Sequence, residues 1–384
     1  MTRRQRVALV PAFMICIVGF GSVSVEACAV PVFRYALERD SWQPAPYPVF
    51  LFHRGELEPQ QRAVLKVLEQ AQIAEAAYPA NILVLAVDVA KPMLDSVKSL
   101  WEAVEPKSLP RLVVCMPVPM TCACNAYSLP PDALQADSLP PDGLQIVWSG
   151  EASSAMAHVL LDSPARREIQ RKTAQGDAAV WVLLESGDEA KDDAAAELVR
   201  RQTEAFAKDF RFSPEAVEAM GLESADAARL AFSLVRVRRA DPAEKMLVAM
   251  LLATEPDLKG FHEPMLFPVF GRGRVLGALV GKGITAENLQ YACAYITGDC
   301  SCEIKEQNPG VDLLISADWY KVLAGVVPPP LPEAWAGMDA SPEAESVRAS
   351  SKTVRNLLVG AGILLLTVIV VSVVLRRRAR KQGV

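Results

Sequence analysis

The strongest constraint on the fold is an order of strand and helix patterns that occurs twice along the chain. In the first occurrence, short apolar runs predict strands, and apolar residues at helical spacing predict helices. The strands are expected at Pro48–His53, Asn81–Val89, Arg111–Met116 and Leu144–Trp148, and the helices at Glu58–Ala76, Pro92–Val104 and Glu151–Lys172. Pro110 precedes the third strand, so the order is β-α-β-α-Pro-β-β-α.

The second occurrence follows the same order, with one helical insertion near Ser213–Met220. Its strands are expected at Ala179–Glu185, Arg229–Val237, Met265–Phe270 and Arg274–Gly281, and its helices at Glu189–Phe210, Pro242–Thr254 and Thr285–Thr297. Pro264 stands before the third strand, as Pro110 does in the first half. Alternation of strands and helices predicts an α/β fold in two domains.

This order resembles the thioredoxin fold, in which a proline before the third strand is followed by a hairpin and a closing helix. The resemblance implies two tandem thioredoxin-like domains, at residues 28–175 and 176–326, with cis-prolines at Pro110 and Pro264. The first domain carries a duplicated stretch, SLPPDALQAD followed by SLPPDGLQIV. Its prolines cannot continue a helix or a central strand, so residues 125–143 are expected to form an inserted surface loop.

Redox-active members of that family place a Cys-x-x-Cys pair between the first strand and the first helix, where the helix N-terminus lowers the pKa of a thiol. Here those positions are His53-Arg54-Gly55-Glu56 and Glu185-Ser186-Gly187-Asp188, without a cysteine. Disulfide exchange by the family's mechanism is therefore not expected. Glu56 and Asp188 are expected to cap the helices that follow.

The N-terminus has the layout of a secretory signal peptide at residues 1–27. Arg3, Arg4 and Arg6 precede the apolar run Val7–Phe20, and small residues lead to Cys28. Val-Glu-Ala before Cys28 also loosely resembles a bacterial lipoprotein box, which leaves lipidation of Cys28 open beside a disulfide or a free thiol.

The C-terminal part predicts a membrane anchor. Leu357 to Leu375 are nineteen consecutive uncharged residues, enough to span a bilayer as a helix, which we expect at 355–375. Residues 327–354 are rich in proline and predict a stalk, and the basic tail 376–384 predicts a cytoplasmic end. The expected arrangement is a single-pass, type I protein of a bacterial cell membrane, with the lipid bilayer as one partner and a periplasmic ectodomain.

Six of the eight cysteines form two triplets with the same spacing, one at Cys115, Cys122 and Cys124 and the other at Cys293, Cys300 and Cys302. The pairs Cys122/Cys124 and Cys300/Cys302 are candidate ligands for a soft metal ion, Cu(I) or Zn. The competing hypothesis is structural disulfides among Cys28, Cys293, Cys300 and Cys302, such as Cys293–Cys300 or Cys28–Cys302. The triplets are not equivalent, because Cys115 falls on a predicted strand and Cys293 on a predicted closing helix.

The first residues after the signal, CAVPVFRYALERD, resemble an uncharacterised bacterial family of exported, membrane-anchored proteins. Four apolar residues, Phe33, Tyr35, Leu37 and Trp42, predict that this arm docks against a domain. The alternative is a recognition surface for a partner, made of Arg34, Tyr35, Glu38 and Arg39.

Composition excludes few functions, although the formal net charge of −5 does not favour nucleic acid as a partner. Neither a G-x-S-x-G elbow nor a zinc-protease motif occurs, so no catalytic residue or cofactor is assigned. The leading hypothesis is an extracytoplasmic scaffold or protein-binding module on redox-inactive domains. The alternative is a protein that handles copper or zinc, or exchanges thiols, through its Cys-x-Cys sites.

Overall fold

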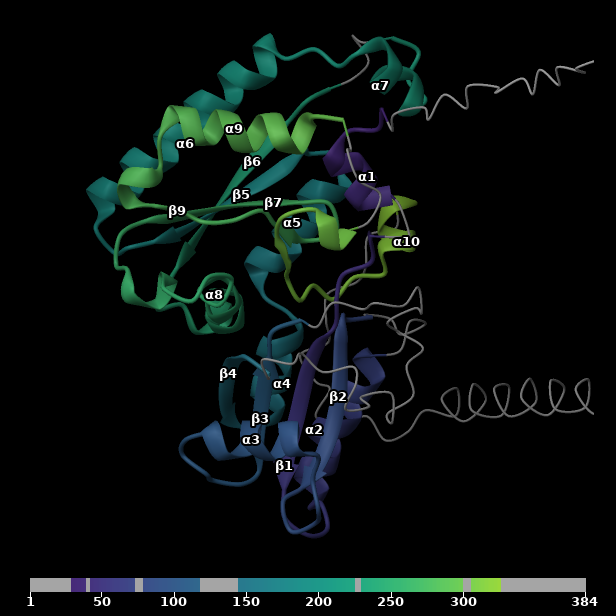
Figure 1. The fold of residues 1–384 in the computed structure, drawn as a ribbon, viewed down its shortest axis with the longest axis vertical. Helices are drawn as coiled ribbons and strands as arrows, with labels where there is room; N and C mark the ends of the chain where they lie inside the picture. Colours follow the sequence, from purple (N-terminus) through teal and green to yellow (C-terminus); the bar gives the residue numbers. More distant parts are fainter. Residues whose placement is uncertain are drawn as a thin grey trace, which may run out of the picture. The chain divides into compact units, whose positions relative to one another are not determined.

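The computed structural model describes residues 29–38, 42–72, 79–117, 144–224, 229–299 and 305–325. These residues form a mixed α/β fold with two sheets, as the alternating patterns predict (Figure 1). The predicted signal peptide, the insertion 125–143, the stalk, the anchor Leu357–Leu375 and the basic tail lie outside the described residues. Within the described ranges, no helix combines the length and apolar character needed to cross a bilayer.

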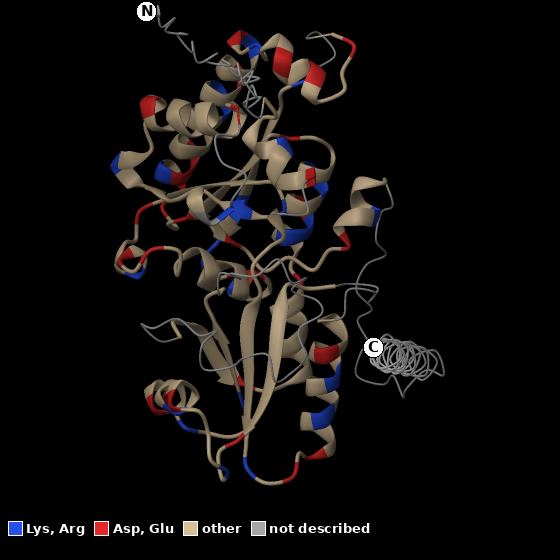
Figure 2. Ribbon diagram, turned by 45° about the vertical axis from the view of Figure 1, so that its right-hand side comes forward, with Lys and Arg blue, Asp and Glu red and all other residues tan. Residues whose placement is uncertain are grey.

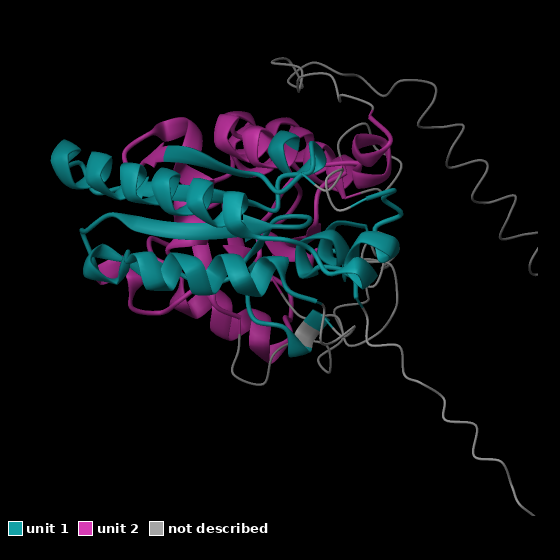
Figure 3. Cartoon of the chain, turned by 90° about the horizontal axis from the view of Figure 1, so that it is seen from above, with its two compact units in different colours: residues 1–43, 171–236, 261–311 teal, residues 44–170, 237–260, 312–384 magenta. Residues whose placement is uncertain are grey.

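The chain divides into two compact units (Figure 3). Unit 1 comprises residues 1–43, 171–236 and 261–311, and unit 2 comprises 44–170, 237–260 and 312–384. These units differ from the predicted division into 28–175 and 176–326 at four places. The N-terminal arm and residues 171–175 belong to unit 1, whereas segments 237–260 and 312–325 belong to unit 2.

The sheet of unit 2 has the strand order β2-β1-β3-β4. Its strands are β1 (Tyr47–His53), β2 (Ile82–Asp88), β3 (Arg111–Cys115) and β4 (Ile146–Glu151). Strands β1 and β2 are parallel, whereas β3 is antiparallel to both β1 and β4. The helices of the first half are α2 (Pro59–Ala71), α3 (Asp95–Ala103), α4 (Ser154–Leu161) and α5 (Pro164–Ala174). The element order is the one predicted, except that the closing helix is broken in two.

That break occurs at Pro164, within the helix predicted at Glu151–Lys172. Proline has no N–H and cannot continue α4, but its fixed φ suits the first position of α5. On one face of the sheet, Phe50, Phe52 and Val113 are buried with Val97 and Leu100 of α3. This apolar layer fixes the strands whose ends carry the first junction described below.

Two short helices follow β6 in the chain, the 3-10 turn η5 (Pro242–Glu244) and α8 (Lys245–Leu251). They replace the single helix predicted at Pro242–Thr254. Helix α8 contacts β4 and α4 of unit 2. Its buried apolar residues, including Met246 and Leu247, explain why this segment leaves the sheet to which its neighbouring strands belong.

The second sheet has the order β10-β8-β7-β5-β6, with β9 also paired to β7. The strands are β5 (Ala179–Glu185), β6 (Phe232–Arg238), β7 (Met265–Phe270), β8 (Arg274–Val275), β9 (Leu279–Val280) and β10 (Val311–Asp312). The helices and 3-10 turns are α6 (Glu189–Asp209), α7 (Pro214–Ala219), η6 (Leu258–Gly260), η7 (Gly281–Gly283), α9 (Ala286–Thr297), η8 (Lys305–Gln307) and α10 (Trp319–Leu323). Helices α6 and α9 lie side by side and share a core with β5 and β7 (Figure 1).

The strand predicted at Arg274–Gly281 is interrupted, because Leu276–Ala278 separate β8 from β9. Pro268 of the neighbouring strand has no N–H to donate, although its carbonyl still accepts from Leu276 N at 3.1 Å. The Leu109–Pro110 peptide bond is cis, as the resemblance implies. Among the described residues the other cis bond is Glu105–Pro106, so a cis bond at Pro264 is not found.

The N-terminal arm folds as helix α1 (Val32–Glu38) and docks within unit 1. Phe33, Tyr35, Leu37 and Trp42 are all buried, which confirms the predicted docking. Because Tyr35 is buried, it cannot belong to the alternative recognition surface; Arg39 of that surface lies outside the described residues.

Close backbone contacts hold the arm in place. Arg272 Nε donates to Leu37 O at 2.7 Å, and Val32 N donates to Gly298 O at 2.9 Å. Gly271 has a φ of 57°, and a Cβ there would lie 2.5 Å from Ala36 Cβ. Only glycine allows this approach without strain.

Charged residues of both signs lie on the helices and loops, while the strands are mostly uncharged (Figure 2). This distribution is typical of a solvated surface around apolar cores.

Candidate functional site

The first candidate site is the connection between β1 and α2, residues His53–Glu58, called here the first junction. His53 ends β1 and is the register partner of Asp88, which ends β2. Asp88 Oδ1 accepts hydrogen bonds from Gly55 N and Ala90 N, each at 3.0 Å. His53 Nδ1 lies 2.9 Å from Gly55 O. The carboxyl ends of two parallel strands thus meet at a loop that is tied down by one carboxylate.

Helix α2 begins from a cap that differs from the expected one. Its N-cap is Glu58, not Glu56, and Glu58 N donates to Gln61 Oε1 at 3.1 Å. The reason is Pro59, which favours the first helical position and moves the start of the helix two residues beyond Glu56.

The second junction, Glu185–Asp188 between β5 and α6, is held by a carboxylate that the sequence does not reveal. Asp192 is only 2% exposed. It accepts from Ser186 N at 2.8 Å, Ser186 Oγ at 2.9 Å and Gly187 N at 3.1 Å. Asp188 caps α6 by accepting from Lys191 N at 3.3 Å, as predicted.

These bonds decide what the junctions can do chemically. Backbone N–H groups at a loop that leads into a helix are natural partners for an external anion or a thiolate. At both junctions the chain's own carboxylates, Asp88 and Asp192, already accept from such groups. The geometry therefore favours closed, rigid loops over open reactive sites.

The first junction should loosen in acid. Backbone hydrogen bonds from Ala90 and Gly55 hold the pKa of Asp88 below its usual value. A lowered folded-state pKa means that the stabilisation is present at neutral pH and is lost as the pH falls through that pKa, below about 4. We expect the amides of Gly55 and Ala90, corrected for intrinsic exchange rates, to lose protection from hydrogen exchange between pH 6 and pH 2. Asp88→Asn should show low protection at both pH values, and wild-type protection in this variant would contradict the assignment.

Beside Pro110, Arg111 fixes the loop that carries both cis bonds. It is buried, and its guanidinium donates to Glu105 O, Ser108 Oγ and Ser149 Oγ at 3.1 to 3.2 Å. These partners belong to the loop itself and to β4. Arg111 therefore holds the loop in place.

The two described cysteines are buried free thiols, Cys115 on β3 and Cys293 on α9. Both positions are the ones predicted. Burial raises the pKa of each thiol to about 12. The candidate metal ligands and disulfide partners Cys28, Cys122, Cys124, Cys300 and Cys302 lie outside the described residues. In the described part of the chain, no three His, Cys, Asp or Glu residues are grouped to hold a metal ion.

Both buried thiols should resist alkylation in the native protein. A thiol with a pKa near 12 is almost entirely protonated at pH 8, and the thiolate is the reactive form. We expect iodoacetamide to label Cys115 and Cys293 only after unfolding in urea, as mapped by peptide mass spectrometry. Native labelling at the rate of an exposed cysteine would show that these thiols are accessible.

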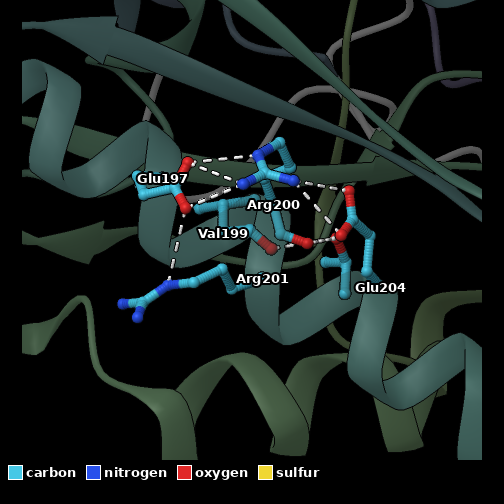
Figure 4. A network of polar contacts seen from close by, with 6 residues as sticks. Glu197, Val199, Arg200, Arg201 and Glu204 are labelled. Carbon is cyan, nitrogen blue, oxygen red and sulfur yellow. Dashed lines mark hydrogen bonds and ion pairs between the residues drawn. The ribbon is translucent and has the colours of Figure 1, made fainter.

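Helix α6 carries a network of charged side chains that, unlike the buried thiols and Asp192, is exposed to solvent. Arg200 bonds both Glu197 and Glu204, and Arg201 lies 3.7 Å from Glu197 (Figure 4). Exposed pairs of this kind contribute little to stability, because solvent and salt screen them. The network is a solvated helix face and supplies control positions for the variants below.

Comparison of this chain with protein-family models, curated proteins and solved structures finds no match.

Proposed function

We propose that this chain is a single-pass, type I protein of a bacterial cell membrane whose ectodomain binds a partner protein outside the cytoplasm. The ectodomain would consist of two thioredoxin-like domains without redox chemistry, acting as a scaffold. The observation that carries the proposal is the pair of strand–helix junctions closed by Asp88 and Asp192.

The order of the first sheet supports a thioredoxin-like domain. The order β2-β1-β3-β4, with β1 and β2 parallel and the other neighbours antiparallel, suits two βα units followed by a hairpin. In the second sheet, β5 is likewise antiparallel to β7, the strand that follows Pro264. It differs from the first sheet in two ways. Its return strand is interrupted at Leu276–Ala278, and the helix that follows β6 in the chain, α8, belongs to unit 2.

Absence of cysteine at both junctions supports binding over thiol redox chemistry. The position where the family keeps its thiols holds His53 to Glu56 in one half and Glu185 to Asp188 in the other. A protein that keeps such a fold without its thiols retains the surface around the junction for contact with another protein. The membrane part of the proposal rests on the apolar run Leu357–Leu375 and the basic residues after it.

A disulfide between Cys28 and Cys302 would fasten the docked arm. Pro31 and Asp299 form an antiparallel bridge, and partners in an antiparallel pair have residue numbers with a constant sum. Cys28 and Cys302 each lie three residues along the chain from a member of this bridge. Forming the bond removes two protons and two electrons from the thiols, which a disulfide-bearing oxidant outside the cytoplasm would accept.

Serine at Cys300 and Cys302 tests the structural role of these thiols. We expect the double variant to lower the free energy of unfolding by about 2–4 kcal/mol, as loss of a native disulfide does. Cys28→Ser should have the same effect, and combining it with Cys302→Ser should cost nothing more. Urea titration measures this, with Cys122→Ser as the matched control.

If the protein instead handles copper or zinc or exchanges thiols, the same variants should give a different result. If the Cys300 and Cys302 variant kept its stability but lost a copper- or zinc-delivery or electron-transfer activity, the scaffold proposal would be wrong. Lipidation of Cys28 would appear as a mass increase on the N-terminal peptide and would exclude the disulfide to Cys302.

A further inference from the structure

Unit 1 contains a pocket of about 200 Å³ that none of the preceding sites uses. It lies between the arm helix α1, the residues before β5, the end of α7 and the residues before β6. Pockets for drug-sized ligands usually measure about 300–1,000 Å³. This pocket therefore suits a single small molecule.

One wall of the pocket is apolar. Phe33 and Phe212 contribute rings whose centroids are 6.4 Å apart, and Met220 and Leu222 belong to the same cluster. Burial of a branched aliphatic or aromatic group against such a wall is favourable by about 25 cal/mol per Å².

Two arginines also line the pocket. Arg34 Nε is buried without a hydrogen-bond partner, although another nitrogen of the same guanidinium lies 2.7 Å from Glu38. Arg229 is exposed, and it makes no hydrogen bond or ion pair with any residue that the structure describes. Guanidinium groups bind carboxylates through paired, charge-assisted hydrogen bonds.

The third charged residue at the pocket is an acid. Asp177 is largely buried and accepts one hydrogen bond from the Ser233 hydroxyl. An ionised carboxylate accepts several hydrogen bonds, so Asp177 has capacity for a ligand's ammonium group. The pocket thus combines an apolar wall, two cations and one anion.

We propose that this pocket binds a free α-amino acid with an apolar side chain. Arg34 and Arg229 would hold its carboxylate, Asp177 its ammonium group, and Phe33, Phe212 and Met220 its side chain. This site goes beyond the proposed scaffold role, because its lining includes no cysteine and no residue of either junction.

Isothermal titration of the full-length protein with L-leucine tests the proposal. The comparison ligands are 4-methylpentanoate, which lacks the ammonium group, and 3-methylbutylamine, which lacks the carboxylate. We expect one saturable site for L-leucine and binding at least about tenfold weaker for either analogue, because each loses charge-assisted hydrogen bonds. Equal affinity for 4-methylpentanoate, or no saturable binding of either L-leucine or L-phenylalanine, would overturn the proposal.

Two variants locate the binding in this pocket. Arg229→Ala should weaken L-leucine binding about tenfold or more, without loss of stability, because Arg229 is exposed and makes no hydrogen bond or ion pair with the described residues. Ala231→Leu should fill the pocket and abolish binding. Arg201→Ala on the exposed face of α6 and Ala205→Leu on the same helix are the controls and should bind as the wild type does. Unchanged binding by Arg229→Ala would place the ligand elsewhere and refute the assignment.

Discussion

Replacing Arg166 with alanine should lower the free energy of unfolding by about 3–5 kcal/mol. Its buried guanidinium donates to Leu160 O and Leu314 O at 2.8 and 3.1 Å, and to Val159 O at 2.6 Å. Burial lowers the pKa of Arg166 to about 10, so the side chain stays charged at neutral pH. Alanine would leave these buried carbonyls without donors, at a cost of about 1–3 kcal/mol for each unsatisfied group.

Urea denaturation of Arg166→Ala measures this loss, and Arg200→Ala is the matched control. Arg200 also makes several bonds to its neighbours, but on an exposed face of α6 (Figure 4). We expect the control to lose much less stability than Arg166→Ala, because solvent screens its exposed ion pairs. Equal losses in the two variants would show that the Arg166 bonds do not hold α4 to segment 312–317.

Trp42→Ala should cost a similar amount in unit 1, about 3–5 kcal/mol. Trp42 is 2% exposed and packs edge-on against Tyr35, with ring centroids 5.8 Å apart. The guanidinium of Arg274 lies 5.8 Å from the centre of its ring. Loss of this side chain leaves a cavity under the arm and removes a cation–π contact.

Thermal and urea unfolding, together with limited proteolysis of the arm, measure the effect of Trp42→Ala. Tyr291→Ala is the matched control, because Tyr291 is an aromatic residue of α9 that is 69% exposed. Its loss should change stability by no more than about 0.5 kcal/mol. If Trp42→Ala behaved like the control, the arm would not be a docked part of unit 1.

Local patterns predicted most of the secondary structure. The apolar runs at β1, β3, β5 and β7 were recognisable because strands buried on both faces have few polar residues. The burial of Phe33 and Trp42 was predicted from the apolar and aromatic residues of the arm. Patterns of this kind depend only on neighbours in sequence.

The assignment of segments to units could not be predicted, because it depends on contacts between distant residues. Asn81 donates to Leu313 O, and the Tyr47 hydroxyl donates to Asp312 O, so segment 312–317 belongs to unit 2. No local pattern distinguishes an asparagine that binds such a segment from one in a turn.

At the second junction, the sequence likewise could not distinguish the roles of two adjacent residues. Asp192 and Asp193 both suit the first turn of a helix. Asp192 is buried and holds Ser186 and Gly187, whereas Asp193 is exposed and pairs with Arg236 at 2.6 Å. Only the direction of each side chain separates the two roles, and that direction depends on the packing of α6.

We propose that the cysteines of this protein stabilise its fold and take no part in redox or metal chemistry. Mass spectrometry of the non-reduced, full-length protein, with the metal content measured on the same sample, tests this proposal. We expect a disulfide between Cys28 and Cys302, free thiols at Cys115 and Cys293, and no stoichiometric copper or zinc. Stoichiometric copper or zinc with every thiol reduced would contradict it.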